Sequence, residues 1–168
     1  GYSTPVPAED GSTLWYGVIE DITERQDAEA RLRESEQKYR ELINNMNDSV
    51  WVIGLDARIL DVNRAATAVL GYTREELLAM SISQIDGALT AEQIQGLIQA
   101  LPSDRTQVFE TRHSAKDGRL VPVEVSSSLA TVAGQTVIVS IARDITERKQ
   151  ADAALRQSQA ALELAQSI

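Results

Sequence analysis

Hydrophobic and polar residues follow two different periods along this chain. Runs rich in β-branched residues or with strict alternation predict five strands, at residues 49–53, 59–63, 107–114, 119–129 and 135–142. Between the second and third strands, helical segments are expected to start near Arg64, Thr73, Ser81 and Thr90. This order predicts an α+β fold, with a five-stranded antiparallel sheet that carries its helices on one face.

Local signals mark the ends of the expected helices. Gly71 is placed to end the first of them, because glycine adopts the left-handed conformation of a C-cap at little cost. Thr73 with Glu76 and Thr90 with Gln93 have the spacing of capping boxes. These signals support several short helices in place of one long one.

A repeat encloses this segment. Residues 21–37 and 144–160 are identical at 10 of 17 aligned positions, and both begin with Asp-Ile-Thr-Glu-Arg. An apolar stretch precedes each copy, so a strand followed by a charged helix is expected twice. Thr146 is the expected N-cap of the second helix.

Apolar residues recur every seven positions in both charged helices. In the first helix, Ala28 and Leu42 share one heptad column, and Leu32, Tyr39 and Met46 share the other. Leu155 and Leu162 form the corresponding column of the second helix. This spacing is typical of a two-stranded coiled coil and favours a parallel homodimer. Two interpretations stay open at this point, the dimer and an amphipathic helix that lies on its own domain.

Composition narrows the function classes. The formal charge of −9 disfavours binding to nucleic acid, whose phosphates an acidic surface repels. The chain has no cysteine, which excludes disulfides and zinc–thiolate sites and fits a cytoplasmic location. No apolar run is long enough to span a bilayer, so no membrane contact is expected from this segment. A membrane anchor of a longer parent protein would lie outside it.

Four motifs carry a family resemblance. They are Asp61-Val62-Asn63-Arg64-Ala65-Ala66, residues 70–77 with Leu-Gly-Tyr-Thr-Arg-Glu-Glu-Leu, Lys116-Asp117-Gly118-Arg119 with residues 122–125, and Arg143-Asp144-Ile145-Thr146-Glu147-Arg148. In this order and spacing the set resembles a bacterial PAS domain with its C-terminal PAC motif, over about residues 36–149. The sequence departs from the family at Gly54 and Ala57, where an Asp-x-x-Gly turn is frequent.

The resemblance implies a division of the chain. Residues 1–22 look like the terminal hairpin of an upstream PAS domain, with Trp15 and Tyr16 expected to be exposed. Residues 23–46 are the helical linker, 47–146 the PAS domain and 147–168 the C-terminal signalling helix. The chain is thus expected to be a fragment of a bacterial multidomain receptor, with adjacent PAS and effector domains as partners in the same parent chain.

Such domains can hold a small apolar ligand between the sheet and the helices. The expected lining is Val52, Asn63, Leu70, Leu97, Ile98, Leu101, Val123, Val125, Ile138 and Ser140. The alternative is an ordinary filled core. His113, the single histidine, is expected on an exposed strand, and no multi-histidine metal site exists. Haem is disfavoured because residues 90–104 lack the histidine of haem-binding relatives, and covalent flavin because there is no cysteine.

The expected role is therefore regulatory and not enzymatic, with no catalytic residues. A dimeric module would pass a signal from its last strand through Asp144, Ile145 and Thr146 to a downstream histidine kinase or diguanylate cyclase. A sensor with a specific pocket ligand and the PAS module of a transcriptional regulator are the alternatives, because fold alone does not fix function.

Overall fold

The computed structural model describes residues 2–18 and 20–167, without the side chains of Tyr16 and Val18. Gly1 and Ile19 of the expected N-terminal hairpin segment, and the exposure predicted for Tyr16, lie outside the described part. The chain divides into two compact units, one ending at Glu41 and one beginning at Leu42.

The first unit contains a hairpin and most of a long helix. Strands β1 (Tyr2–Pro7) and β2 (Thr13–Val18) pair in antiparallel fashion, and the indole of Trp15 is largely exposed. Helix α1 (Thr23–Asn44) follows, and the carboxylate of Asp21 accepts a 2.9 Å hydrogen bond from the N–H of Thr23. A carboxylate at this position satisfies a free N–H and faces the positive end of the helix.

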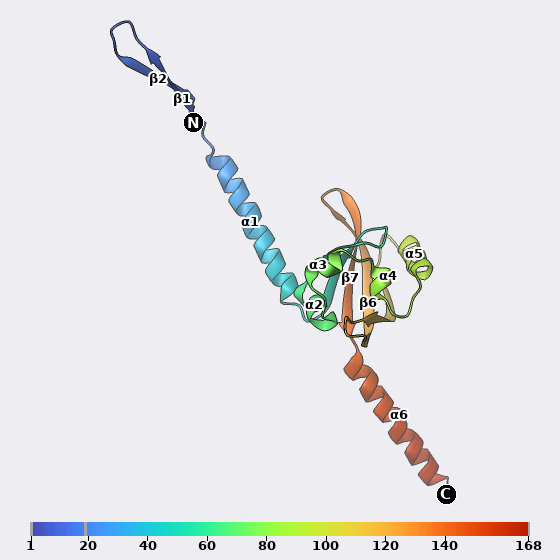
Figure 1. Ribbon diagram of the computed structural model, residues 1–168. Coiled ribbons are helices and arrows are strands. Elements are labelled where there is room, and N and C mark those ends of the chain that lie inside the picture. Colours follow the sequence, from blue (N-terminus) through green and yellow to red (C-terminus); the bar gives the residue numbers. More distant parts are fainter. Residues whose placement is uncertain (1, 19, 168) are drawn as a thin grey trace. The chain divides into compact units, whose positions relative to one another are not determined.

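The second unit contains the predicted sheet, whose five antiparallel strands are confirmed (Figure 1). The strand order is β4-β3-β7-β6-β5. The strands are β3 (Ser49–Ile53), β4 (Ile59–Val62), β5 (Gln107–Ser114), β6 (Leu120–Val132) and β7 (Gln135–Asp144). Strand β7 is central, between β3 and β6, and it ends two residues before helix α6 (Thr146–Gln166) begins.

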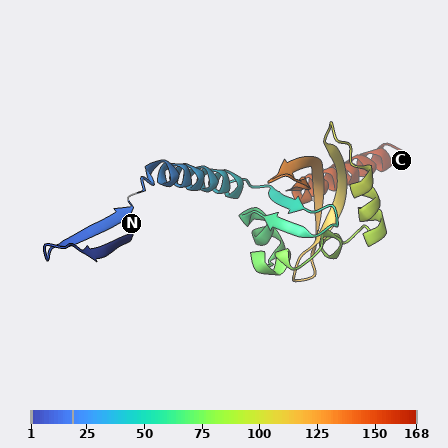
Figure 2. The same ribbon diagram turned by 90° about the horizontal axis from the view of Figure 1, so that it is seen from above.

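Four short helices connect β4 to β5. They are α2 (Arg64–Leu70), α3 (Arg74–Leu78), α4 (Ile82–Ile85) and α5 (Ala91–Ala100). Both predicted capping boxes form, and Gly71 ends α2 with a φ of 77°. Helix α5 lies apart from α2 and α3 along the sheet in both ribbon views (Figure 2).

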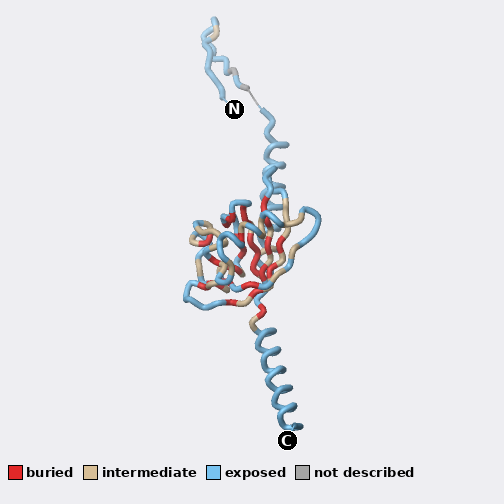
Figure 3. Tube along the Cα trace, turned by 90° about the vertical axis from the view of Figure 1, so that its right-hand side faces the viewer, coloured by how far each residue is buried: buried red, intermediate tan, exposed pale blue. Residues whose placement is uncertain are grey.

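The core of this unit lies between the sheet and the short helices. Trp51, Leu70, Leu77 and Ile85 are its largest fully buried side chains. Alternate residues of β6 point into it, whereas α6 is exposed beyond its first residue (Figure 3). Since most of the buried side chains are apolar, their burial is the main source of stability of the unit.

Candidate functional site

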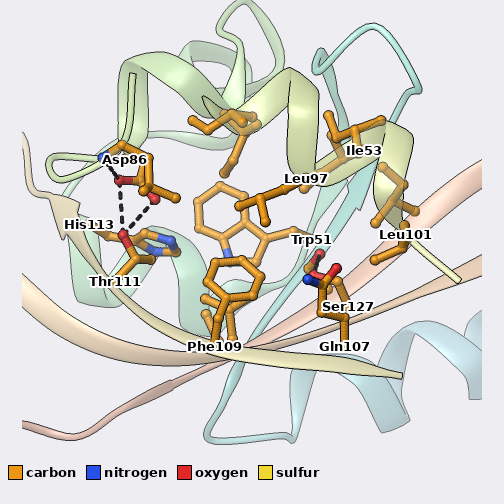
Figure 4. A pocket seen from close by; sticks show the side chains of 18 residues that line it. Trp51, Ile53, Asp86, Leu97, Leu101, Gln107, Phe109, Thr111, His113 and Ser127 are labelled. Atoms are coloured by element: carbon orange, nitrogen blue, oxygen red, sulfur yellow. Dashed lines mark hydrogen bonds between the residues drawn. The ribbon is translucent and has the colours of Figure 1, made fainter. Parts of the chain in front are cut away.

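A cavity of about 60 Å³ lies within the second unit, between the sheet and α5 (Figure 4). It is lined by Trp51, Ile53, Ile82, Asp86, Leu89, Ile94, Leu97, Ile98, Leu101, Gln107, Phe109, Thr111, His113, Val125, Ser127, Ile138, Ser140 and Ala142. Six of these belong to the lining that the sequence predicts: Leu97, Ile98, Leu101, Val125, Ile138 and Ser140. Most of the wall is aliphatic or aromatic, so the cavity suits an apolar molecule.

Two polar atoms of this lining are buried without a hydrogen-bond partner among the described residues. They are the indole Nε1 of Trp51, a donor, and the amide Oε1 of Gln107, an acceptor. The indole lies at the centre of the lining side chains (Figure 4). A buried polar group without a partner costs free energy, which makes these two atoms candidate ligand contacts.

Other polar groups at the cavity are satisfied within the protein. The hydroxyls of Ser127 and Ser140 lie 2.7 Å apart and share a hydrogen bond. The carboxylate of Asp86 accepts from the N–H groups of Ala88 and Leu89, both at 2.8 Å, and from the hydroxyl of Thr111. Asp86 therefore fixes the loop before α5 and ties it to β5.

The exposure predicted for His113 is wrong, because the side chain is only 4% exposed. It faces inward from β5, and its ring meets that of Trp51 edge to face with the centroids 5.6 Å apart. Burial lowers the pKa of His113 to about 4, and the nearby charge of Asp86 opposes this only in part. The imidazole is therefore neutral at physiological pH.

The four other predicted lining residues lie elsewhere. Leu70 and Val123 are buried in the apolar core, and Val52 is half-buried on β3. Asn63 holds the N-terminal boundary of the second unit. Its Oδ1 accepts from the N–H groups of Val50 (2.9 Å) and Ala66 (3.1 Å). Its Nδ2 donates to the carbonyls of Ile43 and Asp48, both at 3.0 Å, so the amide is fully used.

These contacts coincide with the end of α1. The side chain of Asn44 accepts from the N–H of Arg64 at 2.9 Å, beside the bond from Asn63 to Ile43. Helix α1 ends at Asn44, so Met46 lies beyond the helix that was expected to carry it. The carbonyl of Ile43 and the side chain of Asn44, the last two residues of α1, are thus both bound to the start of α2.

The predicted coupling residues form the junction between β7 and α6. Asp144 accepts from the backbone N–H of Thr146 at 2.8 Å and from its hydroxyl at 2.6 Å. The expectation that the Thr146 hydroxyl caps α6 is wrong, since that hydroxyl donates to Asp144. Ile145 is 3% exposed, and its N–H donates to the carbonyl of Pro122 on β6 at 3.0 Å.

Ion pairs attach the first turn of α6 to the neighbouring strands. Arg148 contacts Glu110 of β5 at 2.7 Å and Glu124 of β6 at 3.2 Å, and Lys149 also pairs with Glu110. The hydrogen bond from Lys149, together with the charges of both cations, holds the pKa of Glu110 below its usual value. The start of α6 is thus connected to three strands of the sheet.

The predicted dimer positions are exposed. Leu32, Tyr39 and Leu42 on α1 and Leu155 and Leu162 on α6 are each 58% exposed or more, and Ala28 is exposed as well.

No helix in the described ranges is both long enough and apolar enough to cross a membrane. Residues 2–18 and 20–167 also contain no group of three or more acidic, histidine or cysteine side chains arranged to bind a metal.

Sequence reasoning missed one wall of the cavity. Gln107, Phe109, Thr111 and His113 are alternate residues of β5, so they share the inward face of that strand. The period of two was visible in the sequence. The sequence does not show which side of the strand faces inward, because Val108 on the opposite face is as apolar as the inward residues.

Comparison with known proteins finds a matching family model and similar sequences. Residues 47–147 match the family model described as PAS domain. The methyl sulfide methyltransferase-associated sensor of Methanosarcina acetivorans is 33% identical over 133 residues, which cover 79% of this chain and 13% of the relative. The sensor histidine kinase TmoS of Ectopseudomonas mendocina is 28% identical over 90% of this chain and 16% of its own length. The chain thus spans less than a fifth of these relatives.

A solved structure agrees with the fold. The crystal structure of the PAS domain of an HTR-like protein from Haloarcula marismortui has a TM-score of 0.69 and 31% sequence identity. The match covers 71% of this chain and 99% of that domain.

Proposed function

Because the chain belongs to the PAS domain family, the kind of sensory domain found in sensor histidine kinases, we propose that it relays a signal from its sheet to a downstream effector through α6. The observation that carries this proposal is the junction of β7 with α6. Only Ile145 separates the central strand from the helix, and that residue is buried and hydrogen-bonded to β6.

The contacts at this junction hold Ile145 firmly and hold the direction of α6 only weakly. Burial of the Ile145 side chain contributes about 2 kcal/mol and its hydrogen bond about 1 kcal/mol. The ion pairs of Arg148 and Lys149 are substantially exposed, and exposed pairs of this kind contribute little to stability. A shift of β5 or β6 would therefore redirect α6 through weak contacts without releasing Ile145.

The effector proposed is a histidine kinase, as in the relative TmoS, and a diguanylate cyclase is the alternative. The module would act as a parallel homodimer, in which the exposed leucines of α1 and α6 pair with their copies. Small residues such as Ala28 in the seam bury little area, so each coil is marginal by itself. A marginal coil is one that a small change of helix direction can rearrange.

The relay is tested in the parent protein with Asp144→Ala. This change removes both hydrogen bonds to Thr146 and leaves the buried Ile145 in place, so the fold should persist while the output no longer responds. Asp152→Ala is the matched control, because Asp152 is an exposed aspartate within α6, away from the junction. Wild-type output from Asp144→Ala would refute the role of this junction.

The dimer is tested by deletion of residues 1–40, followed by measurement of the mass in solution. We expect the dimer of the shortened chain to dissociate at a higher protein concentration than that of the full chain, since it lacks most of the α1 seam. An unchanged oligomeric state would reject α1 as the dimer element.

A further inference from the structure

We propose that the cavity binds a small uncharged alcohol or ketone, with the indole N–H of Trp51 donating to its oxygen. The ligand oxygen would supply the acceptor that Trp51 Nε1 lacks, and an alcohol proton would supply the donor that Gln107 Oε1 lacks. This inference deepens the proposed relay function and rests on it only for the consequence of binding.

The charges at the cavity select a neutral ligand. None of the described lining residues is a lysine or an arginine, so an anion would have no cation to pair with. His113 is neutral, and Asp86 is already bound to two backbone N–H groups and to Thr111. An unpaired charge buried among apolar groups is strongly unfavourable in either sign.

The size of the cavity sets an upper limit on the ligand. An engineered apolar cavity of about 150 Å³ holds one benzene molecule. At the same packing the cavity here, about 60 Å³, holds about two or three non-hydrogen atoms as it stands, so a ligand of about five fits only where one wall yields. A ligand of that size binds with a Kd on the order of 1 mM.

The wall formed by α5 is the one that can yield to a ligand. Of its residues only Ile94 is buried, and Leu97, Ile98 and the following Leu101 are half-buried against the cavity. A side-chain hydrogen bond from Gln95 to the carbonyl of Leu55, at 3.2 Å, holds its outer face. A bound molecule can therefore contact both the sheet and a helix that is held mainly by apolar packing.

Nuclear magnetic resonance of the ¹⁵N-labelled chain gives a direct test. The chain has two tryptophans, Trp51 in the cavity wall and Trp15 in the hairpin, so two indole N–H signals report on one candidate site and one internal control. Trp15→Phe assigns them. Titration with 2-butanone or 2-butanol should move the Trp51 signal saturably and leave the Trp15 signal in place. Propionate and butylammonium, which have as many non-hydrogen atoms as the neutral probes, should move neither.

Two variants separate the hydrogen bonds from apolar filling. Trp51→Phe keeps an aromatic ring but removes the donor. It should weaken 2-butanone about tenfold while leaving the isosteric hydrocarbon 2-methyl-1-butene within about threefold, read from the backbone signals of Val125 and Ser140. Gln107→Met should weaken 2-butanol and leave 2-butanone unchanged. The dispersion of sheet amide signals confirms that each variant is folded.

The outcomes decide between the two proposals. No saturable movement of the Trp51 signal with either neutral probe overturns the ligand proposal, and so does propionate binding as tightly as 2-butanone. That failure leaves the relay untouched, since Asp144→Ala tests it independently. Movement at Trp51 without any change in the amides of Thr146 to Lys149 supports the ligand and contradicts the relay.

Discussion

Asn63 offers the sharpest test of how the second unit is held at its N-terminal boundary. The side chain is 3% exposed and makes four hydrogen bonds, two as acceptor and two as donor. Asn63→Ala removes all four. Loss of the N-cap contact to Ala66 costs about 1 kcal/mol. The N–H of Val50 would be left buried without a partner, which costs about 2 kcal/mol more.

We therefore expect a loss of about 3 kcal/mol in the free energy of unfolding, or roughly 10 °C in Tm. Urea unfolding followed by circular dichroism measures it. Asn45→Ala is the matched control, since Asn45 is an exposed asparagine in the same segment and should change stability by less than about 0.5 kcal/mol. Equal effects of the two substitutions would refute the account of this boundary.

Asn63→Asp tests the donor half separately. The introduced carboxylate keeps the two accepting contacts, which favour its charged form, but it is buried and faces the carbonyls of Ile43 and Asp48. Burial and these two oxygens together raise the pKa of the new carboxyl group. The folded state then binds more protons than the unfolded state, so the stability of this variant relative to wild type should fall as pH rises from 4 to 7. A pH-independent difference from wild type would contradict the assignment of the amide orientation.

Three further predictions follow from other parts of the fold. The pKa of His113 is about 4 when folded and 6.5 when unfolded, so acid favours the unfolded state. The free energy of unfolding should therefore drop by about 2 kcal/mol from pH 7 to pH 5, and in urea unfolding His113→Gln should remove most of this pH dependence. Ala133 has a φ of 49° in the turn between β6 and β7, so Ala133→Asn should raise stability by about 0.5–1 kcal/mol, and a lower Tm would contradict this. Glu110→Gln should leave the free energy of unfolding almost unchanged yet speed amide exchange at Lys149, and this difference should shrink in 1 M salt because salt screens exposed ion pairs.

The sequence predicts those features of the fold that depend on neighbouring residues. Gly71 ends α2 in the left-handed conformation, and Thr73 and Thr90 form capping boxes, because each signal acts within one turn. The strand pattern also predicts the hairpins β3–β4, β5–β6 and β6–β7, since alternation and hairpin turns are local, whereas the pairing of β3 with β7 is not local. Ala57 is an exception, since it adopts a φ of 67° without being a glycine, and its carbonyl accepts a 2.9 Å hydrogen bond from the N–H of Ile82.

The candidate site depends on contacts that no local pattern contains. Arg148 reaches Glu110 across 38 residues, and Asn63 reaches Ile43 across 20, so neither contact follows from spacing. The exposure predicted for His113 is wrong because β5 has polar residues on its inward face, where they line the cavity. A polar residue on a strand normally predicts the exposed side, and this rule fails where a strand borders a cavity.

The rigidity of residues 143–149 is the property on which the relay depends. Backbone ¹⁵N relaxation measures it directly as an order parameter for each amide between Arg143 and Lys149. The account predicts values near 0.85 throughout, equal to those of β7, because Ile145 is buried and bonded to Pro122. Values below about 0.6 at Asp144 to Glu147 would mean that the helix moves independently of the sheet, and would contradict the proposed relay.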